Sequence, residues 1–190
     1  ASIAVVVAIL AAALLYYFHL PVEIYSLETA QREVDSITVS VETSAKPEAL
    51  LLTCADAYGN TFSAVPGADH TATFEGLSSN TPYTITVESA KGRSIRGTNT
   101  LTVSTLGLTE ILSFDVNEMY DNGAELSLTA SGPEPITWRL EITSEQEAPR
   151  TVNFSGHSAR ITGLTPATAY TFTLQNVQDY NLSGTLTCSG

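Results

Sequence analysis

One stretch of the chain reads Gly163-Leu164-Thr165-Pro166-Ala167-Thr168-Ala169-Tyr170-Thr171-Phe172-Thr173-Leu174. Small and turn-forming residues come first, and from the tyrosine onward polar and apolar residues alternate, which is the period of a strand with one buried face. The stretch therefore predicts a tight turn that leads into a half-buried β-strand. A looser copy lies 87 residues earlier, from Gly76-Leu77 through Thr81-x-Tyr83-x-Ile85-x-Val87.

The same spacing relates other parts of the chain. Glu23-Ile24-x-Ser26-Leu27-Glu28 recurs as Glu110-Ile111-x-Ser113-Phe114-Asp115. A repeat at a fixed distance indicates copies of one structural unit. We expect two β units, unit 1 over residues 21–107 and unit 2 over residues 108–190, behind an apolar helix over residues 1–20.

Both units show short runs rich in Thr, Val, Ile and Tyr between turn residues, and helical periodicity is weak. Such a pattern is typical of an all-β fold, and seven short strands in a unit suggest a sandwich of two sheets. In unit 1 we predict strands over residues 23–28, 36–42, 49–56, 61–65, 71–75, 83–89 and 100–104. In unit 2 we predict them over residues 110–116, 124–130, 136–144, 151–154, 159–162, 169–176 and 185–189.

The turn and strand quoted first resemble the signature of fibronectin type III domains, Leu-x-Pro-x-Thr-x-Tyr followed by alternating apolar residues. The matching residues are Leu164 and Tyr170 in unit 2, and more loosely Leu77 and Tyr83 in unit 1. The resemblance implies two tandem seven-stranded fibronectin type III-like sandwiches. It also implies that each tyrosine forms a tyrosine corner, in which the hydroxyl of a buried ring hydrogen-bonds back to the preceding loop. Another immunoglobulin-like sandwich is the alternative.

The chain departs from the family pattern in two places. The family usually carries a tryptophan on its second strand, whereas the only tryptophan here, Trp138, falls on the predicted third strand of unit 2, where we expect a structural role. Unit 1 has Ser79 in place of the proline of the signature.

Residues 1–20 contain no Lys, Arg, Asp or Glu, and Pro21 follows them. Twenty helical residues cover about 30 Å, the thickness of a bilayer's hydrocarbon core, so we expect a single transmembrane helix. A cleaved signal peptide is the alternative, but the apolar run is long for one. The first basic residue after the run is Arg32, and a flank poor in basic residues favours the translocated side. Both units should then face outward at the cell surface.

The repeat places the first strand about two residues after the apolar helix, so no stalk separates the two. That outline is similar to archaeal pilins and flagellins, in which an apolar N-terminal helix runs into a β-sandwich. A pilin-like structural subunit of an extracellular filament, with residues 1–20 packed against like helices in the filament core, is therefore a second hypothesis.

The chain has 20 acidic and 8 basic residues and a formal net charge of −12. A negative surface repels phosphate backbones, which argues against nucleic acid as a partner. The two cysteines, Cys54 and Cys188, fall in different units. We expect buried thiols that act as small apolar residues, because a disulfide needs Cα atoms about 5.5 Å apart.

Motifs of catalysis and of cofactor binding are absent from the sequence, including Gly-x-Ser-x-Gly, His-Glu-x-x-His, Cys-x-x-Cys and a glycine-rich phosphate loop. We expect a protein that is not an enzyme and needs no cofactor. His70 and His157 occupy equivalent positions of the repeat, which favours a structural role for both. Asn153 and Asn181 each begin an acceptable N-glycosylation triplet.

Oxygen-bearing side chains gather around the first predicted turn of unit 2. Calcium binds six or more such oxygens, and the candidate ligands are Asp115, Asn117, Asp121 and Glu125. Neighbouring residues of a strand point to opposite faces, so a solvated acidic turn is favoured over a calcium site.

A basic loop is predicted between the last two strands of unit 1. It carries Lys91, Arg93 and Arg96, three of the eight basic residues, and the equivalent loop of unit 2 has none. An ordinary solvated hairpin is favoured, and the alternative is a site for an anionic glycan, a lipid headgroup or an acidic protein. We expect adhesion or interaction with an extracellular protein or glycan, through outward-facing domains anchored in the membrane by residues 1–20.

Overall fold

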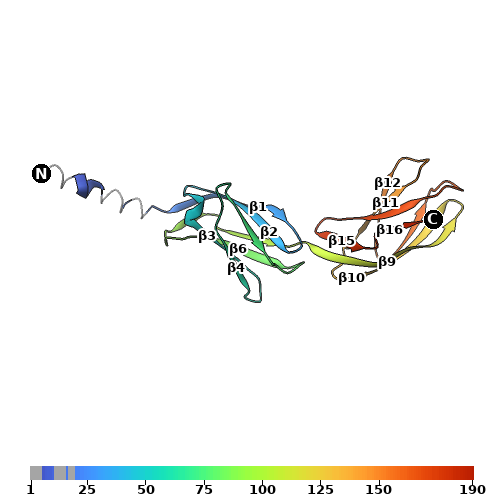
Figure 1. Ribbon diagram of the computed structural model, residues 1–190, viewed down its shortest axis with the longest axis horizontal. Helices are drawn as coiled ribbons and strands as arrows, with labels where there is room; N and C mark the ends of the chain where they lie inside the picture. Colours follow the sequence, from blue (N-terminus) through green and yellow to red (C-terminus); the bar gives the residue numbers. More distant parts are fainter. Residues whose placement is uncertain (1–5, 11–15, 17–19) are drawn as a thin grey trace. The chain divides into compact units, whose positions relative to one another are not determined.

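The computed structural model describes residues 6–10, 16 and 20–190. Contacts divide the chain into two compact units, Ala1–Thr105 and Leu106–Gly190. Each unit contains a sandwich of two four-stranded sheets (Figure 1). The expectation of an all-β chain with two sandwich domains is thereby confirmed.

In unit 1 one sheet has the order β5-β2-β1-β7 and the other the order β4-β3-β6-β8. All neighbours pair antiparallel except β1 and β7, which run parallel. The elements are β1 (Val22–Arg32), β2 (Ser36–Thr43), the short 3-10 helix η1 (Pro47–Ala49), β3 (Leu50–Ala55), β4 (Thr61–Ala64), β5 (Thr71–Glu75), β6 (Pro82–Ser89), β7 (Ile95–Gly97) and β8 (Thr100–Ser104).

Unit 2 repeats this topology, with the sheet orders β13-β10-β9-β15 and β12-β11-β14-β16. Its single parallel pairing joins β15 to β9. The strands are β9 (Gly107–Tyr120), β10 (Gly123–Ser131), β11 (Trp138–Thr143), β12 (Arg150–Phe154), β13 (Ser158–Thr162), β14 (Thr171–Gln175), β15 (Tyr180–Gly184) and β16 (Thr187–Ser189).

Each unit buries its own core between its two sheets, because alternate residues of a strand point to the same face. In β2 the apolar residues Ile37, Val39 and Val41 are fully buried, and the residues between them are partly exposed. Burial of one such side chain stabilises the fold by roughly 1.5–3 kcal/mol. The core of unit 2 is centred on larger residues, among them Trp138, Phe114 and Phe172.

The prediction of seven strands per unit was wrong, since the described residues form eight strands in each unit. The missed strands are β7, which includes part of the predicted basic loop, and β15, which lies in the equivalent loop of unit 2. Both end on a glycine with positive φ, +90° at Gly97 and +85° at Gly184, two positions related by the repeat. A Cβ at either position would collide with a backbone carbonyl oxygen, of Ile24 or of Ile111. Glycine therefore permits the close approach that pairs each strand in parallel with the first strand of its unit.

The first strands are also longer than predicted. β1 continues to Arg32 and β9 to Tyr120, and register shifts interrupt the pairing of each with its hairpin partner. Such bulges increase the local twist of a strand. Asp121 and Asn122 form the two-residue connection between β9 and β10, where the sequence predicted a turn.

The prediction of one continuous helix over residues 1–20 falls mainly on residues outside those described. Residues 6–10 and 16 are helical, and the Leu20 N–H donates to the Tyr16 carbonyl oxygen at 3.2 Å. Within the described residues, no helix has both the length and the apolar character that crossing a membrane requires.

Candidate functional site

Arg93, in the predicted basic loop, is bound to the end of the N-terminal segment. Its Nε and Nη2 atoms donate to the Leu20 carbonyl oxygen at 2.8 and 2.6 Å, and Nη2 lies 3.4 Å from the Pro21 carbonyl oxygen. Beside it, the Val22 N–H donates to the Ser94 carbonyl oxygen at 2.8 Å. The basic loop therefore fastens the start of β1 at the point where the apolar run ends.

A second loop adds a basic residue that the sequence analysis did not connect with this region. Lys46, which precedes η1, lines a hollow of about 330 Å³ together with Lys91 and Arg93. The side chains of Lys46 and Lys91 are exposed, and Glu48 is the only acidic residue of the lining. Three cationic groups thus surround one small hollow.

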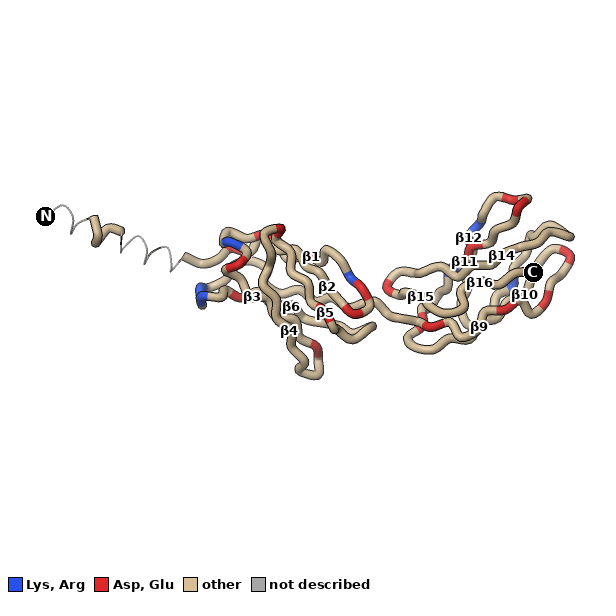
Figure 2. The backbone as a smooth tube through the Cα atoms, in the orientation of Figure 1, with Lys and Arg blue, Asp and Glu red and all other residues tan. Residues whose placement is uncertain are grey.

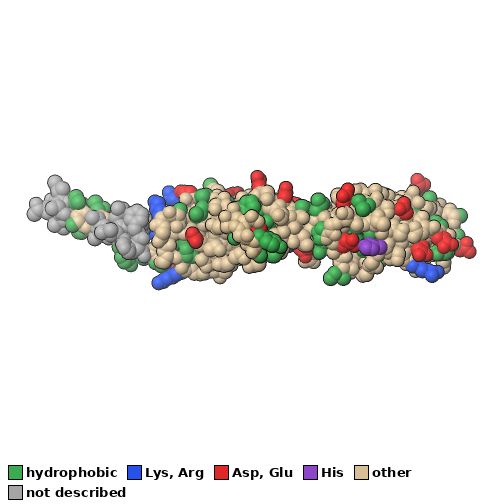
Figure 3. Space-filling model, turned by 90° about the horizontal axis from the view of Figure 1, so that it is seen from below, with side chains coloured by type: hydrophobic (Ala, Val, Ile, Leu, Met, Phe, Trp, Pro, Cys, Tyr) green, Lys and Arg blue, Asp and Glu red, His purple; other side chains and the backbone are tan. Residues whose placement is uncertain are grey.

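Arg96 lies apart from the hollow, on β7. It pairs in register with Glu23 of β1, and its Nη1 atom is 3.8 Å from Glu23 Oε1. An exposed ion pair of this length contributes little to stability. We call Lys46, Lys91, Arg93 and Arg96 the basic cluster. Figure 2 marks basic positions of the backbone at the end of unit 1 where β1 begins, and Figure 3 shows basic side chains at that end.

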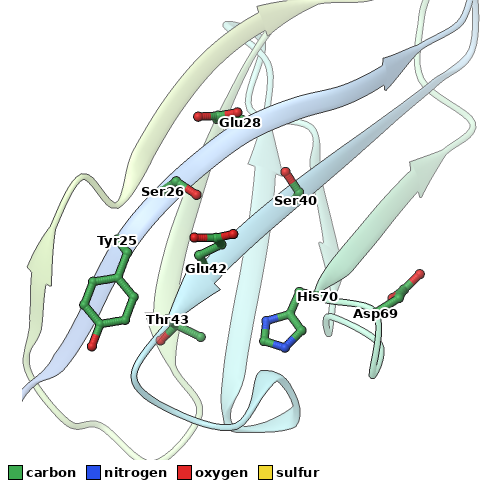
Figure 4. A pocket seen from close by; sticks show the side chains of 8 residues that line it. All are labelled: Tyr25, Ser26, Glu28, Ser40, Glu42, Thr43, Asp69 and His70. Carbon is green, nitrogen blue, oxygen red and sulfur yellow. The ribbon is translucent and has the colours of Figure 1, made fainter.

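A larger hollow, of about 650 Å³, lies over the outer face of β1 and β2 in unit 1. Its lining carries the carboxylates of Glu28, Glu42 and Asp69, together with the exposed ring of Tyr25. Ser26, Ser40, Thr43 and His70 complete the lining, and Figure 4 shows all eight side chains. Such a surface accepts hydrogen bonds and attracts cationic groups.

Unit 2 does not reproduce this lining. At the repeat spacing, Tyr25 corresponds to Leu112, Glu42 to Thr129 and Asp69 to Gly156. The sequence analysis missed the hollow because its residues come from two strands and a loop, and each alone looks like an ordinary solvated residue. Comparison of the two units' outward positions would have been the available signal.

The two equivalent histidines make different contacts. His70 has a positive φ of +64°, and its Nδ1 atom lies 3.3 Å from the Val41 carbonyl oxygen. His157 Nε2 lies 2.6 Å from Glu134 Oε2 on the surface of unit 2. Their backbone carbonyls nevertheless share one role, because they accept from Val41 N–H and Leu128 N–H respectively. The two histidines are therefore equivalent in their backbone hydrogen bonds and differ in their side-chain contacts.

The calcium candidates are not brought together. Asn117 Oδ1 accepts a hydrogen bond from the Ser127 hydroxyl, and Glu125 Oε2 accepts one from the Tyr120 hydroxyl at 3.1 Å. Asp115 lies on β9 and Asp121 in the turn that follows it. Among the residues that the structure describes, no three His, Cys, Asp or Glu side chains are grouped so that they could hold a metal ion.

The Tyr120 hydroxyl is held between two carboxylates. It lies 2.9 Å from Glu118 Oε2, and this hydrogen bond, with the one to Glu125, raises the pKa of Tyr120 to about 12. The Arg160 guanidinium lies over the Tyr120 ring, 5.3 Å from its centroid. These contacts form a charged patch on the outer face of the sheet.

The signature tyrosines lie in matching environments. The Tyr83 hydroxyl accepts from the Ser78 N–H, and the Tyr170 hydroxyl accepts from the Thr165 N–H, both at 2.9 Å. Both rings are buried, as are Leu77, Leu164 and Trp138. Each hydroxyl reaches back five residues to the turn before its strand, so it ties that turn to the core.

Both cysteines are free thiols. Cys54 is buried in the core of unit 1, and desolvation, followed by the charge of Asp56, raises its pKa from 9.0 to about 11. Cys188 is half-buried against the core of unit 2, and burial and Asp115 raise its pKa in the same way, also to about 11. A thiol that resists ionisation is a poor nucleophile.

Comparison with known proteins identifies the fold. No protein-family profile matches the chain, and no curated protein sequence matches it. A segment of two fibronectin type III domains from chicken tenascin is 19% identical, with a TM-score of 0.45, over 88% of this chain and 97% of that one. The FN1-FN3 domains of chicken CNTN1 are 10% identical, with a TM-score of 0.51, over 90% of this chain and 64% of that one. The likeness to the CNTN1 domains shows that the two units have the fold of tandem fibronectin type III domains, as the signature tyrosines implied.

Proposed function

We propose that this chain is a non-enzymatic protein of the cell surface, in which residues 1–20 anchor two outward-facing fibronectin type III-like domains in a membrane. The domains would mediate adhesion, or interaction with an extracellular protein or glycan. Domains of this fold serve many functions, so the proposal rests on features of this chain.

The observation that supports it best is that the Arg93 guanidinium donates hydrogen bonds to the carbonyl oxygens of Leu20 and Pro21. A guanidinium that binds backbone carbonyl oxygens holds that part of the chain against the loop that carries it. Here that loop belongs to the sandwich of unit 1, so the domain contacts the last residue of the apolar run directly. A joint of this kind suits a domain held close to the surface in which the apolar run is embedded.

The anchor is tested by flotation of the full chain with phosphatidylcholine vesicles on a density gradient. We expect the chain to float with the vesicles and to stay with them after a wash in high salt, because salt screens charge attraction but does not weaken apolar burial. The same chain with Leu10 and Leu14 both changed to Arg is the matched control and should remain at the bottom. If the parent chain stays at the bottom of the gradient while the vesicles float, the anchor is excluded.

The direct joint also supports a second candidate, a subunit of an extracellular filament. In that case residues 1–20 would pack against like helices, and a stiff joint would place every sandwich in the same way around the core. Electron microscopy of the chain without lipid separates the two candidates. Filaments with screw symmetry would support the subunit, and dispersed or micellar particles would support the anchor.

A further inference from the structure

We propose that the basic cluster of unit 1 docks on the anionic headgroups of the bilayer that holds residues 1–20. The inference rests on the proposed anchor and names a second, electrostatic contact between the same domain and the membrane. Its partner is an anionic phospholipid surface.

The position of the basic cluster follows from hydrogen bonds within unit 1. Arg93 binds the carbonyl oxygens of Leu20 and Pro21, and Ser94 accepts from the Val22 N–H. If the apolar run ends at the headgroup boundary, the loop that carries Lys91 and Arg93 lies at the same level. Lys46 lies there too, because it lines the same hollow.

The charges of unit 1 are unevenly distributed. Residues 21–105 include ten acidic and five basic residues, and four of those five belong to the basic cluster. Of the ten acidic residues, three lie at this end: Glu23 pairs with Arg96, Glu48 lines the hollow, and Glu88 is exposed at the end of β6, three residues before Lys91. The four basic residues still outnumber these three acidic ones, whereas the rest of the unit has seven acidic residues and one basic residue. An anionic bilayer would therefore repel the rest of the unit more strongly than this end, which favours one orientation of the docked domain.

The hollow itself suits phosphate groups. Lysine offers three donors as a compact charge, and a guanidinium offers a planar set of donors that matches phosphate oxygens. Near an anionic surface, each Lys or Arg favours association by roughly fivefold. Several such residues together make the docked orientation dominant, even though Arg93 also binds the carbonyl oxygens of Leu20 and Pro21.

The chain provides its own reporters, because Lys46 and Lys91 are its only lysines. The full chain is placed in lipid discs of phosphatidylcholine, with or without added phosphatidylglycerol. Acetylation of the two lysines by an amine-reactive ester is followed by mass spectrometry, and a free lysine peptide in the same tube reports reagent activity.

We expect both lysines to react at least about fivefold more slowly in the anionic discs. The difference should vanish at about 1 M salt, where charges are screened within about 3 Å. Equal rates in the two discs at low salt would overturn the docking while the anchor stands. If the lysines react at equal rates in the two discs and react more slowly only after heparin is added, the proposal of a lipid partner is overturned and an anionic glycan is favoured. A chain that does not co-purify with either disc would overturn the anchor, and the docking with it.

A pair of variants separates local docking from the effect of net charge. Arg96→Gln removes one charge from the basic cluster and keeps both reporters, so the protection in anionic discs should fall. Arg139→Gln removes one exposed charge from unit 2 and should leave the protection unchanged. Equal losses in the two variants would show general charge attraction and would overturn a docking site at this end of unit 1.

Discussion

The Arg93 guanidinium donates two hydrogen bonds to a single acceptor, the carbonyl oxygen of Leu20, at 2.8 and 2.6 Å. Leu20 precedes the strand that opens unit 1, and Arg93 follows the sixth strand, so 73 residues separate the partners. A planar guanidinium can reach one oxygen with two nitrogens, and a lysine ammonium cannot reproduce that geometry.

Arg93→Lys should therefore loosen the joint without unfolding unit 1. Two charge-assisted hydrogen bonds at an exposed site are together worth about 1 kcal/mol. The Val22 amide, which donates to Ser94, reports opening of the joint, and its hydrogen exchange should accelerate about fivefold. Arg96→Lys serves as control and should leave that exchange rate unchanged. An unaltered Val22 amide in the Arg93 variant would show that the joint depends on other contacts.

Gly97→Ala should destabilise unit 1 strongly, because a Cβ there meets the Ile24 carbonyl oxygen and φ is +90°. Gly59 has the same φ of +90° but open space around it, so Gly59→Ala isolates the backbone strain. We expect losses of about 1–2 kcal/mol for Gly59→Ala and about 3 kcal/mol or more for Gly97→Ala. Chemical denaturation measures both. Similar losses would mean that β7 can move away from β1 at little cost.

Tyr170→Phe should destabilise unit 2 by about 1–3 kcal/mol, because the part-buried hydrogen bond from the Thr165 N–H to the hydroxyl of the buried tyrosine is lost. Tyr83→Phe should act alike in unit 1, where the Ser78 N–H loses its acceptor. Tyr58 is 89% exposed, and Tyr58→Phe is the matched control with no expected change. If all three variants have the same denaturant midpoint, the hydroxyls of Tyr83 and Tyr170 do not contribute to stability.

Stability of unit 1 should fall as the pH rises from about 9 to about 11. The folded state raises the pKa of Cys54 from 9.0 to about 11, so it favours the neutral thiol. This contribution is complete below the unfolded pKa and is lost as the pH climbs through the folded one. Denaturant midpoints measured across this interval should drop more steeply in the parent than in Cys54→Val. Parallel curves would show that other groups, such as tyrosines, dominate the alkaline transition.

The strands of both sandwiches could be predicted where burial alternates along the chain. β5 covers residues Thr71–Glu75 as expected, because Ala72 and Phe74 face the core and their neighbours face solvent. β7 and β15 escaped prediction because they are short edge strands, and their parallel pairing joins residues more than 70 positions apart. The glycine that ends each of them recurs at the repeat spacing, and that recurrence was the available signal.

The basic cluster was only half predictable, for a related reason. Lys91, Arg93 and Arg96 are neighbours in sequence, whereas Lys46 reaches the same hollow from a loop 45 residues earlier. Counting basic residues beside the apolar run suggested a flank poor in positive charge. In the folded unit the four residues of the basic cluster lie beside the end of the apolar run. A count along the chain misses them because they are distant in sequence.

The parallel pairing of β1 with β7 has a mechanical consequence. The chain enters unit 1 through β1 and leaves after β7 and β8, so tension between the unit's two ends pulls β1 and β7 in opposite directions along their length. Their hydrogen bonds are then loaded together, in shear, and cannot open one after another as in an unzipped hairpin. β9 and β15 repeat the arrangement in unit 2. Forced unfolding is governed by the rate of crossing such a barrier, so both units are built to resist pulling.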